Sequence, residues 1–135
     1  MGKIEWGPEY ETGVREIDSQ HRTLLGIYND LSDALELDTA GQAAATTLDR
    51  LLHYTDFHFK TEERMMVEHG YPMSSAHTAE HYVLIERSKL LQHRLQGGDQ
   101  KVAVDTLDFL KRWLINHIQK VDRDLAEYLQ SRGVN

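Results

Sequence analysis

Side chains that can bind a metal recur along the chain at helical spacings. His58 and Glu62 are four residues apart, and so are His77 and His81. Residues at i and i+4 lie on one face of a helix, one turn apart, so each pair can direct two donors at one point. Three further candidates stand on other segments, and the full set is His21, His58, Glu62, His77, His81, His117 and Asp122.

The chain has eight histidines in 135 residues and no cysteine. This composition excludes thiolate sites and favours imidazole–carboxylate chemistry. Five imidazoles and two carboxylates are more than one tetrahedral zinc ion binds, and calcium and magnesium prefer shells of oxygen. The donor set therefore favours iron. It suffices for two six-coordinate ions that share both carboxylates and a bridging oxygen from solvent, with one position left for a small ligand.

The elements that must position these donors are four helices. Apolar residues from Leu24 and Leu25 through Tyr28 to Leu31 follow the i, i+3, i+4, i+7 spacing of one helical face, and the later segments repeat this pattern. Glycines and Pro8 occur among the first residues and interrupt regular helix there, so the sequence predicts an irregular arm. We expect one domain over 1–135, with an arm over 1–17 and helices near 18–37, 41–69, 75–96 and 99–132.

Short connections between these segments predict an all-α fold, an up-down-up-down antiparallel four-helix bundle. In that topology the first and third helices run one way and the other two run the opposite way. His21, His77 and His81 come early in their helices, whereas His58 and His117 come late. All seven candidate ligands are therefore expected toward the same end of the bundle.

One spacing does not suit a regular helix. His117 and Asp122 are five residues apart, which places them about 140° apart at about 3.6 residues per turn. A local π-bulge near Lys120 would bring the two side chains onto one face, and such bulges are frequent at functional sites. The sequence therefore predicts a helix distortion at this point.

Charge and hydropathy exclude several classes of protein. The formal net charge is −7, and an acidic chain repels phosphate backbones, so nucleic acid is not an expected partner. No run of 18 apolar residues occurs, and the first residues do not resemble a signal peptide. We therefore expect a cytoplasmic protein without membrane insertion.

Four motifs resemble the signatures of the bacterial hemerythrins, and together they span nearly the whole chain. The first is Trp6…Tyr10…Gly13 with Ile17-Asp18-Ser19-Gln20-His21, and the second is His58-Phe59-Lys60-Thr61-Glu62-Glu63. The others are His77-x-x-x-His81 and Trp113-Leu114-x-x-His117-Ile118-x-x-x-Asp122. The five-residue gap between His117 and Asp122 is the spacing of that family.

The resemblance implies a non-haem diiron site that binds molecular oxygen reversibly, for storage, delivery to an acceptor protein, or buffering. It implies that His77, His81 and His117 bind one iron and that His21 and His58 bind the other, with a vacant position for oxygen. Glu62 and Asp122, with an oxo or hydroxo group, would bridge the irons. It also implies an apolar oxygen pocket of Leu24, Phe59, Trp113, Leu114 and Ile118.

Two alternatives stay open at this point. A diiron enzyme, such as an oxidase, a peroxidase or a nitric oxide scavenger, is one. Ferritin-like oxidases carry paired Glu-x-x-His motifs, and this chain has none. An oxygen or redox sensor is the other; since the chain ends at Asn135, a sensor would need a separate partner, and no apolar helix face is evident to recruit one. We therefore expect an oxygen-binding protein without enzymatic activity.

Overall fold

The computed structural model describes residues 3–37, 42–97 and 100–135, without the side chains of 37, 42 and 100–103. A short 3-10 helix, η1 (Pro8–Tyr10), lies in the N-terminal segment. The main elements then follow in the order α1 (Arg15–Leu37), α2 (Gln42–Glu68), α3 (Ser74–Gln96), α4 (Gln100–Asn116), the π-helical segment η2 (His117–Asp122) and α5 (Arg123–Ser131).

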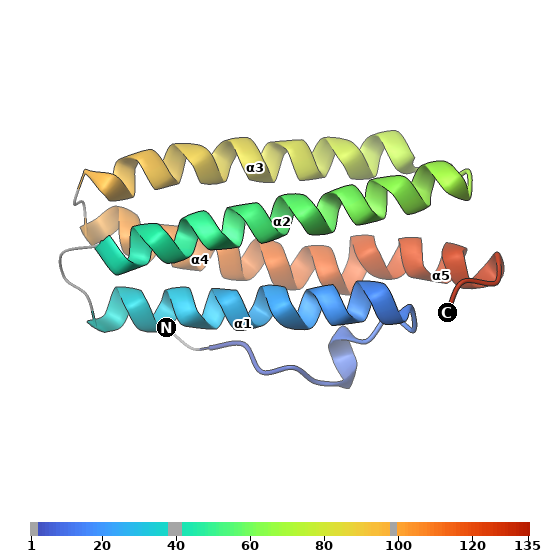
Figure 1. Cartoon of the computed structure of the whole chain (residues 1–135), viewed down its shortest axis with the longest axis horizontal. Helices are drawn as coiled ribbons and strands as arrows, with labels where there is room; N and C mark the ends of the chain where they lie inside the picture. Colours follow the sequence, from blue (N-terminus) through green and yellow to red (C-terminus); the bar gives the residue numbers. More distant parts are fainter. Residues whose placement is uncertain (1–2, 38–41, 98–99) are drawn as a thin grey trace.

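These elements form an antiparallel four-helix bundle (Figure 1). α4, η2 and α5 continue one another and together make the fourth long helix, while α1, α2 and α3 make the other three. Neighbouring helices run in opposite directions, and the N-terminal segment packs along α1. The all-α, up-down-up-down bundle predicted from the sequence is confirmed.

Some local details differ from the expectation. α1 begins at Arg15 and not near residue 18, so the irregular arm is shorter than the expected 1–17 and Asp18 lies inside the helix. Ser74 is the first residue of α3, and Met73 precedes it without a capping hydrogen bond from its side chain. The expected breaks at 38–41 and near 99 lie outside the described residues.

α2 ends where the sequence predicts a stop. Gly70 has a φ of +64°, a left-handed conformation that glycine adopts without steric cost. The amide of Tyr71 then donates to the carbonyl of Met66 at 2.9 Å, which satisfies one of the last carbonyls of the helix. The Tyr128 hydroxyl donates to the carbonyl of His69 at 2.5 Å, so α5 holds this turn in place.

The apolar core consists of two clusters, one on each side of a polar layer. Most of the bundle packs around the larger cluster, which includes Leu24, Phe59 and Ile118. Ile17, Met66 and Leu125 belong to the smaller one. On α1, on α2 and on the fourth long helix the candidate ligands fall between residues of the two clusters. On α3 they are followed by Leu84 of the larger cluster, and Tyr71, just before the helix, packs against the smaller one. Apolar packing on both sides therefore fixes the position of the polar layer along the bundle.

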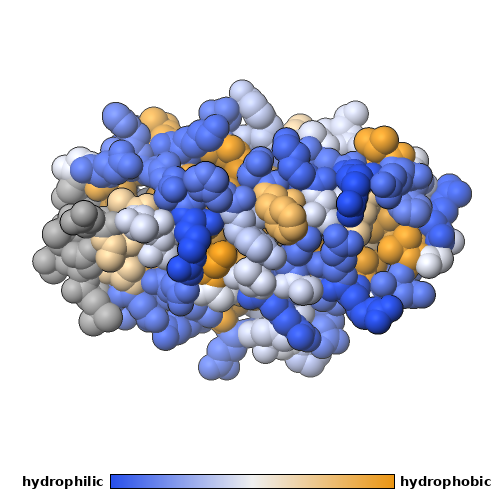
Figure 2. Space-filling model, in the orientation of Figure 1, coloured by the Kyte–Doolittle hydropathy of each residue, from blue (hydrophilic) through white to orange (hydrophobic). Residues whose placement is uncertain are grey.

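The visible face of the molecule is largely hydrophilic, with hydrophobic residues in separate patches (Figure 2). The expectation that no helix exposes an apolar face was wrong for α3, where Tyr82, Val83 and Leu90 are each more than half exposed. α3 carries apolar residues on more than one side, so their spacing does not tell which side is buried. Among the described residues, no helix combines the length and hydrophobicity needed to cross a bilayer.

Asp18 and Arg123 attach the N-terminal arm to the bundle. The Asp18 carboxylate accepts hydrogen bonds from the Thr12 amide at 2.8 Å, the Thr12 hydroxyl at 2.7 Å and the Gly13 amide at 3.2 Å. The Arg123 guanidinium donates to the carbonyl of Glu9 at 2.5 Å. Because Arg123 directly follows Asp122, the arm is anchored next to the polar layer.

We expect Asp18→Ala to lower the free energy of unfolding by about 1–3 kcal/mol, because it removes an ionised acceptor of three hydrogen bonds. Asp33→Ala is the matched control. Asp33 pairs with Lys3 at 3.1 Å on the surface, and such a pair contributes about 0–1 kcal/mol. Urea denaturation of both variants would measure the difference, and equal losses would contradict the proposed anchoring role of Asp18.

Candidate metal centre

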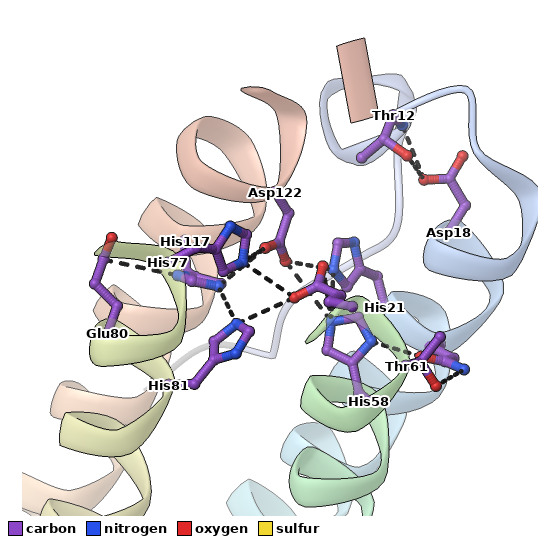
Figure 3. A network of polar contacts seen from close by, with 12 residues as sticks. Thr12, Asp18, His21, His58, Thr61, His77, Glu80, His81, His117 and Asp122 are labelled. Carbon is purple, nitrogen blue, oxygen red and sulfur yellow. Dashed lines mark hydrogen bonds and ion pairs between the residues drawn. The ribbon is translucent and has the colours of Figure 1, made fainter. Parts of the chain in front are cut away.

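The seven candidate ligands converge in the polar layer, and each is at most 3% exposed. They come from α1, α2, α3 and η2. Figure 3 shows that His21, His58, His77, His81, His117 and Asp122 point toward one another. Their donor atoms form two groups, each within the reach of one metal ion. His77, His81 and His117 belong to one group, His21 and His58 belong to the other, and both groups contain Glu62 and Asp122.

The three-histidine group faces one oxygen of each carboxylate. Glu62 Oε1 lies 3.2 Å from His77 Nε2 and 3.1 Å from His81 Nε2. Asp122 Oδ1 lies 3.0 Å from His77 Nε2 and 2.9 Å from His117 Nε2. The Nε2 atoms of His81 and His117 are 3.3 Å apart. Five donor atoms therefore surround one point.

The two-histidine group faces the other oxygen of each carboxylate. Glu62 Oε2 lies 3.4 Å from His58 Nε2. Asp122 Oδ2 lies 2.7 Å from His21 Nε2 and 3.7 Å from His58 Nε2, and the two Nε2 atoms are 3.1 Å apart. Among the residues that the structure describes, four protein donors surround this second point, one fewer than in the first group.

η2 explains how His117 and Asp122 reach the same point. Their five-residue separation is spanned by a π-helix from His117 to Asp122, in which hydrogen bonds run from i to i+5. The wider turn brings residues five apart onto one face. The helix distortion predicted from the sequence is confirmed.

Partners on the outer side of two rings determine which nitrogen carries the proton. His58 Nδ1 donates to Gln20 Oε1 at 2.7 Å, and His81 Nδ1 donates to Glu63 Oε2 at 3.0 Å. The Gln20 amide nitrogen donates in turn to the Thr61 hydroxyl at 3.1 Å. Protonated Nδ1 atoms leave the Nε2 lone pairs directed at the centre, which is the form that binds metal.

Gln20 and Glu63 stand in the sequence motifs, but the motifs gave neither of them a partner. The sequence offered one indication of their role, because each is next to a candidate ligand: Gln20 precedes His21 and Glu63 follows Glu62. Their actual partners, however, lie on other helices. Adjacency along the chain therefore indicates that these residues lie near the centre, but it does not predict which ring each one binds.

Aromatic rings hold two of the imidazoles. Phe59 stacks on His81 with ring centroids 3.7 Å apart and the planes 5° from parallel. Trp113 stacks on His117 with centroids 4.2 Å apart and planes 15° from parallel. Each stack restricts the rotation of an imidazole, so the donor atoms are held in place before a metal ion arrives.

The donor atoms of the centre are placed well to bind metal ions and poorly to form hydrogen bonds with one another. Glu62 Oε2 and Asp122 Oδ1 are buried without a hydrogen bond of good geometry, although imidazole nitrogens lie nearby. A buried carboxylate oxygen in this state is costly. Neighbouring ligands of an octahedral ion, with bonds of about 2.1 Å, lie about 3 Å apart, which matches the separations in both groups. The residues present therefore fit a pair of cations.

The carboxylates are held in the ionised form. Burial and the charge of Asp122 raise the pKa of Glu62, but His58 and hydrogen bonds from His77 and His81 outweigh them and lower it to about 2. Burial likewise raises the pKa of Asp122, and the charge and hydrogen bond of His117 bring it well below its usual value.

The pKa values of two histidines are raised in the metal-free fold. Burial lowers the pKa of His77, but hydrogen bonds to Asp122 and Glu62 outweigh this effect and raise it to about 10. Burial also opposes the charged form of His58, while the charge of Glu62 raises its pKa overall. Positive charge is therefore stabilised among these side chains, either as protons or as metal ions.

An apolar cavity adjoins the centre on the side of the two-histidine group. It reaches both histidines of that group, His21 and His58, and also His117 and Asp122, and it leaves no room for a water molecule. All five residues expected to form an apolar pocket line it, and Thr55 lines it as well. The structure therefore brings together Leu24, Phe59, Trp113, Leu114 and Ile118.

Comparison with known proteins agrees with this geometry. Residues 12–129 match the model of the hemerythrin HHE cation binding domain. The chain is 36% identical to a bacteriohemerythrin of Methylococcus capsulatus over 124 residues, which cover 91% of this chain and 94% of the relative. It is 34% identical to a bacteriohemerythrin of Stenotrophomonas maltophilia over 133 residues, which cover 97% of this chain and 84% of the relative.

Solved structures show the same likeness. A crystal structure of wild-type hemerythrin superposes with a TM-score of 0.84 at 34% identity, over 95% of this chain and 98% of that one. Structures of hemerythrin variants L114Y and L114A superpose equally well, again with TM-scores of 0.84. The match extends from the sequence to the arrangement of all four helices, and the chain therefore belongs to the hemerythrin family.

Proposed function

We propose that this chain holds two iron ions in its metal centre and binds molecular oxygen reversibly beside them. The observation that carries the proposal is the orientation of the two buried carboxylates, whose oxygens face different groups of histidines. Each presents one oxygen to the three-histidine group and the other to the two-histidine group. Carboxylates in this position can bridge two ions, and relatives named bacteriohemerythrin cover nearly all of the chain.

The unequal donor counts support an open position. His77, His81 and His117 would hold one ion together with one oxygen of each carboxylate. His21 and His58 would hold the second with the remaining oxygens. A bridging oxo or hydroxo group from solvent would complete six ligands on the first ion and bring the second to five. The apolar cavity lies on the side of the second ion, where a small ligand would enter.

When bound, the two irons supply the electrons that oxygen takes up on binding and returns on release. The protein contributes a dry surrounding for that exchange. Leu24, Phe59, Leu114 and Ile118 are each at most 3% exposed, and the cavity they line has no space for water. Excluding water prevents proton entry and loss of the reduced ligand. Because the cavity is this narrow, oxygen enters only when a lining side chain moves.

Reversible binding is favoured over an enzymatic reaction by what lines this cavity. Cleavage of the oxygen–oxygen bond needs a group that donates protons. Outside the metal centre, no acid, lysine or histidine lines the cavity in the described part of the chain. The Thr55 hydroxyl already donates to the carbonyl of Leu51 at 2.7 Å. A role as an oxidase, a peroxidase or a nitric oxide scavenger therefore stays the second candidate.

The biological use of oxygen binding stays a prediction. Storage, delivery and buffering all need the same reversible site, and a sensor would use it too. The exposed residues Tyr82, Val83 and Leu90 on α3 leave room for a partner protein, but they do not favour one use over another. The oxygen acceptor and the cytoplasmic location also stay predictions.

The protein reduced without oxygen should change colour in air and recover its first spectrum after degassing, with two irons per chain.

His77→Ala should abolish stable oxygen binding, since it removes a donor that lies near both carboxylates. His53→Ala is the control, because His53 is exposed and outside the centre. Optical spectra and metal analysis measure both. One ion per chain, or full reversibility in His77→Ala, would contradict the proposal, and irreversible bleaching with substrate turnover would favour an enzyme.

We expect Trp113→Ala to speed autoxidation severalfold, because the change opens the apolar cavity to water and releases the stacked ring of His117. Trp113→Phe keeps an aromatic ring there and should stay near the wild-type rate. The decay of the oxygenated spectrum in air measures both rates. A wild-type rate in Trp113→Ala would remove this residue from the protection of the site.

Binding of ferrous iron at pH 7 should release at least one proton per chain. His77 has a pKa of about 10 in the metal-free fold, so it holds a proton at pH 7 that metal binding must displace. An indicator dye in weakly buffered solution, with iron added without oxygen, measures the release. His77→Ala should release fewer protons per bound ion. Loading of the wild-type chain without any proton release would be incompatible with this assignment.

A further inference from the structure

A second hollow reaches the metal centre from the side opposite the apolar cavity. It has a volume of about 140 Å³ and lies where α3 faces η2 and α5. His77 lines it from within, and Glu80 and Asp124 line it from outside. We call it the outer hollow. The two cavities touch different ligands, since the apolar cavity reaches His21 and His58 but not His77.

The outer hollow combines apolar side chains with His77, Glu80 and Asp124, and it has room for water. A water molecule occupies about 30 Å³ in the liquid, so the hollow accommodates several. Nδ1 of His77 is buried without a hydrogen-bond partner, and so is Nδ1 of His117. Glu80 Oε1 lies 3.8 Å from the latter, too far for a direct hydrogen bond. Unlike His58 and His81, the His77 ring has no protein partner on its outer side, and because it lines the outer hollow, water in the hollow can take that place.

Two carboxylates stand on the exposed side of the outer hollow. Glu80 lies beside His77 and His117, on the side away from His21 and His58 (Figure 3). Its side chain is 49% exposed, and Asp124 is exposed as well. Neither pairs with a lysine or an arginine in the described part of the chain. Their charges are therefore available to attract a cation.

We propose that the outer hollow is the port through which hydrated divalent cations enter and leave the centre, with Glu80 and Asp124 as the carboxylates that take the ion first. This inference rests on the proposed metal centre. The apolar cavity does not suit a cation, because it has no room for a hydrated ion. Outside the metal centre its lining in the described part of the chain is apolar except for Thr55, so a cation would have to shed its water there at a high cost in free energy. In the outer hollow the ion keeps water and gains carboxylate oxygens before it reaches His77.

The rate of metal release tests this proposal on the intact, loaded protein. Ferrous iron would be trapped by an excess of a ferrous chelator without oxygen, and its appearance followed optically. The double variant Glu80→Gln/Asp124→Asn should release iron about tenfold more slowly, because the ion in passage loses two stabilising charges. Its iron content after full loading should stay at two per chain.

A second variant acts by size alone. Ala76 lines the outer hollow and is exposed, so Ala76→Trp should obstruct the passage and slow release without changing charge. Glu86→Gln/Asp105→Asn is the matched control, with the same change of charge on exposed residues outside the hollow. It should release iron at the wild-type rate.

The possible results distinguish a failure of the proposed port from a failure of the proposed metal centre. Wild-type release rates in both hollow variants would overturn the port, and so would an equal slowing in the Glu86/Asp105 control. A reduced iron content in Glu80→Gln/Asp124→Asn would also count against it, because these residues would then hold the centre itself. A wild-type chain that binds no iron would overturn the proposed function instead.

Discussion

The burial of two carboxylates, Glu62 and Asp122, is the constraint on which the rest of the structure depends. Both are fully buried, and a charge taken out of water costs several kcal/mol unless it is compensated. Here the compensation requires donors from every helix of the bundle at one height. The apolar clusters on either side of the polar layer hold the helices at that height. Positive charge among the imidazoles, as protons or as metal ions, then balances the carboxylates.

The same constraint explains the irregular fourth helix. In a regular α-helix Asp122 would point about 140° away from His117, and one carboxylate would leave the polar layer. The π-helical turn between them corrects the direction at the expense of regular hydrogen bonding. The long helix therefore divides into α4, η2 and α5, and Arg123, at the start of α5, reaches back to hold the N-terminal arm.

The two sides of the centre differ in chemistry because they differ in ligands and lining. Around His21 and His58 the lining is apolar and too narrow for water, which suits a small uncharged molecule. Around His77 the lining includes carboxylates and leaves room for water, which suits a hydrated ion. For the function proposed above, separate routes keep the apolar cavity apart from the water that the outer hollow can hold.

The sequence by itself determined the features that depend on spacing within one segment: the four helices, the set of seven candidate ligands, the stop at Gly70 and the distortion between His117 and Asp122. Only the tertiary structure decided which carboxylate oxygen faces which group of histidines, and that Gln20 and Glu63 bind rings on other helices. It also decided that Asp18 holds the arm and that α3 exposes apolar residues. These contacts depend on how each helix is rotated about its axis, which is set by the packing of all four helices together.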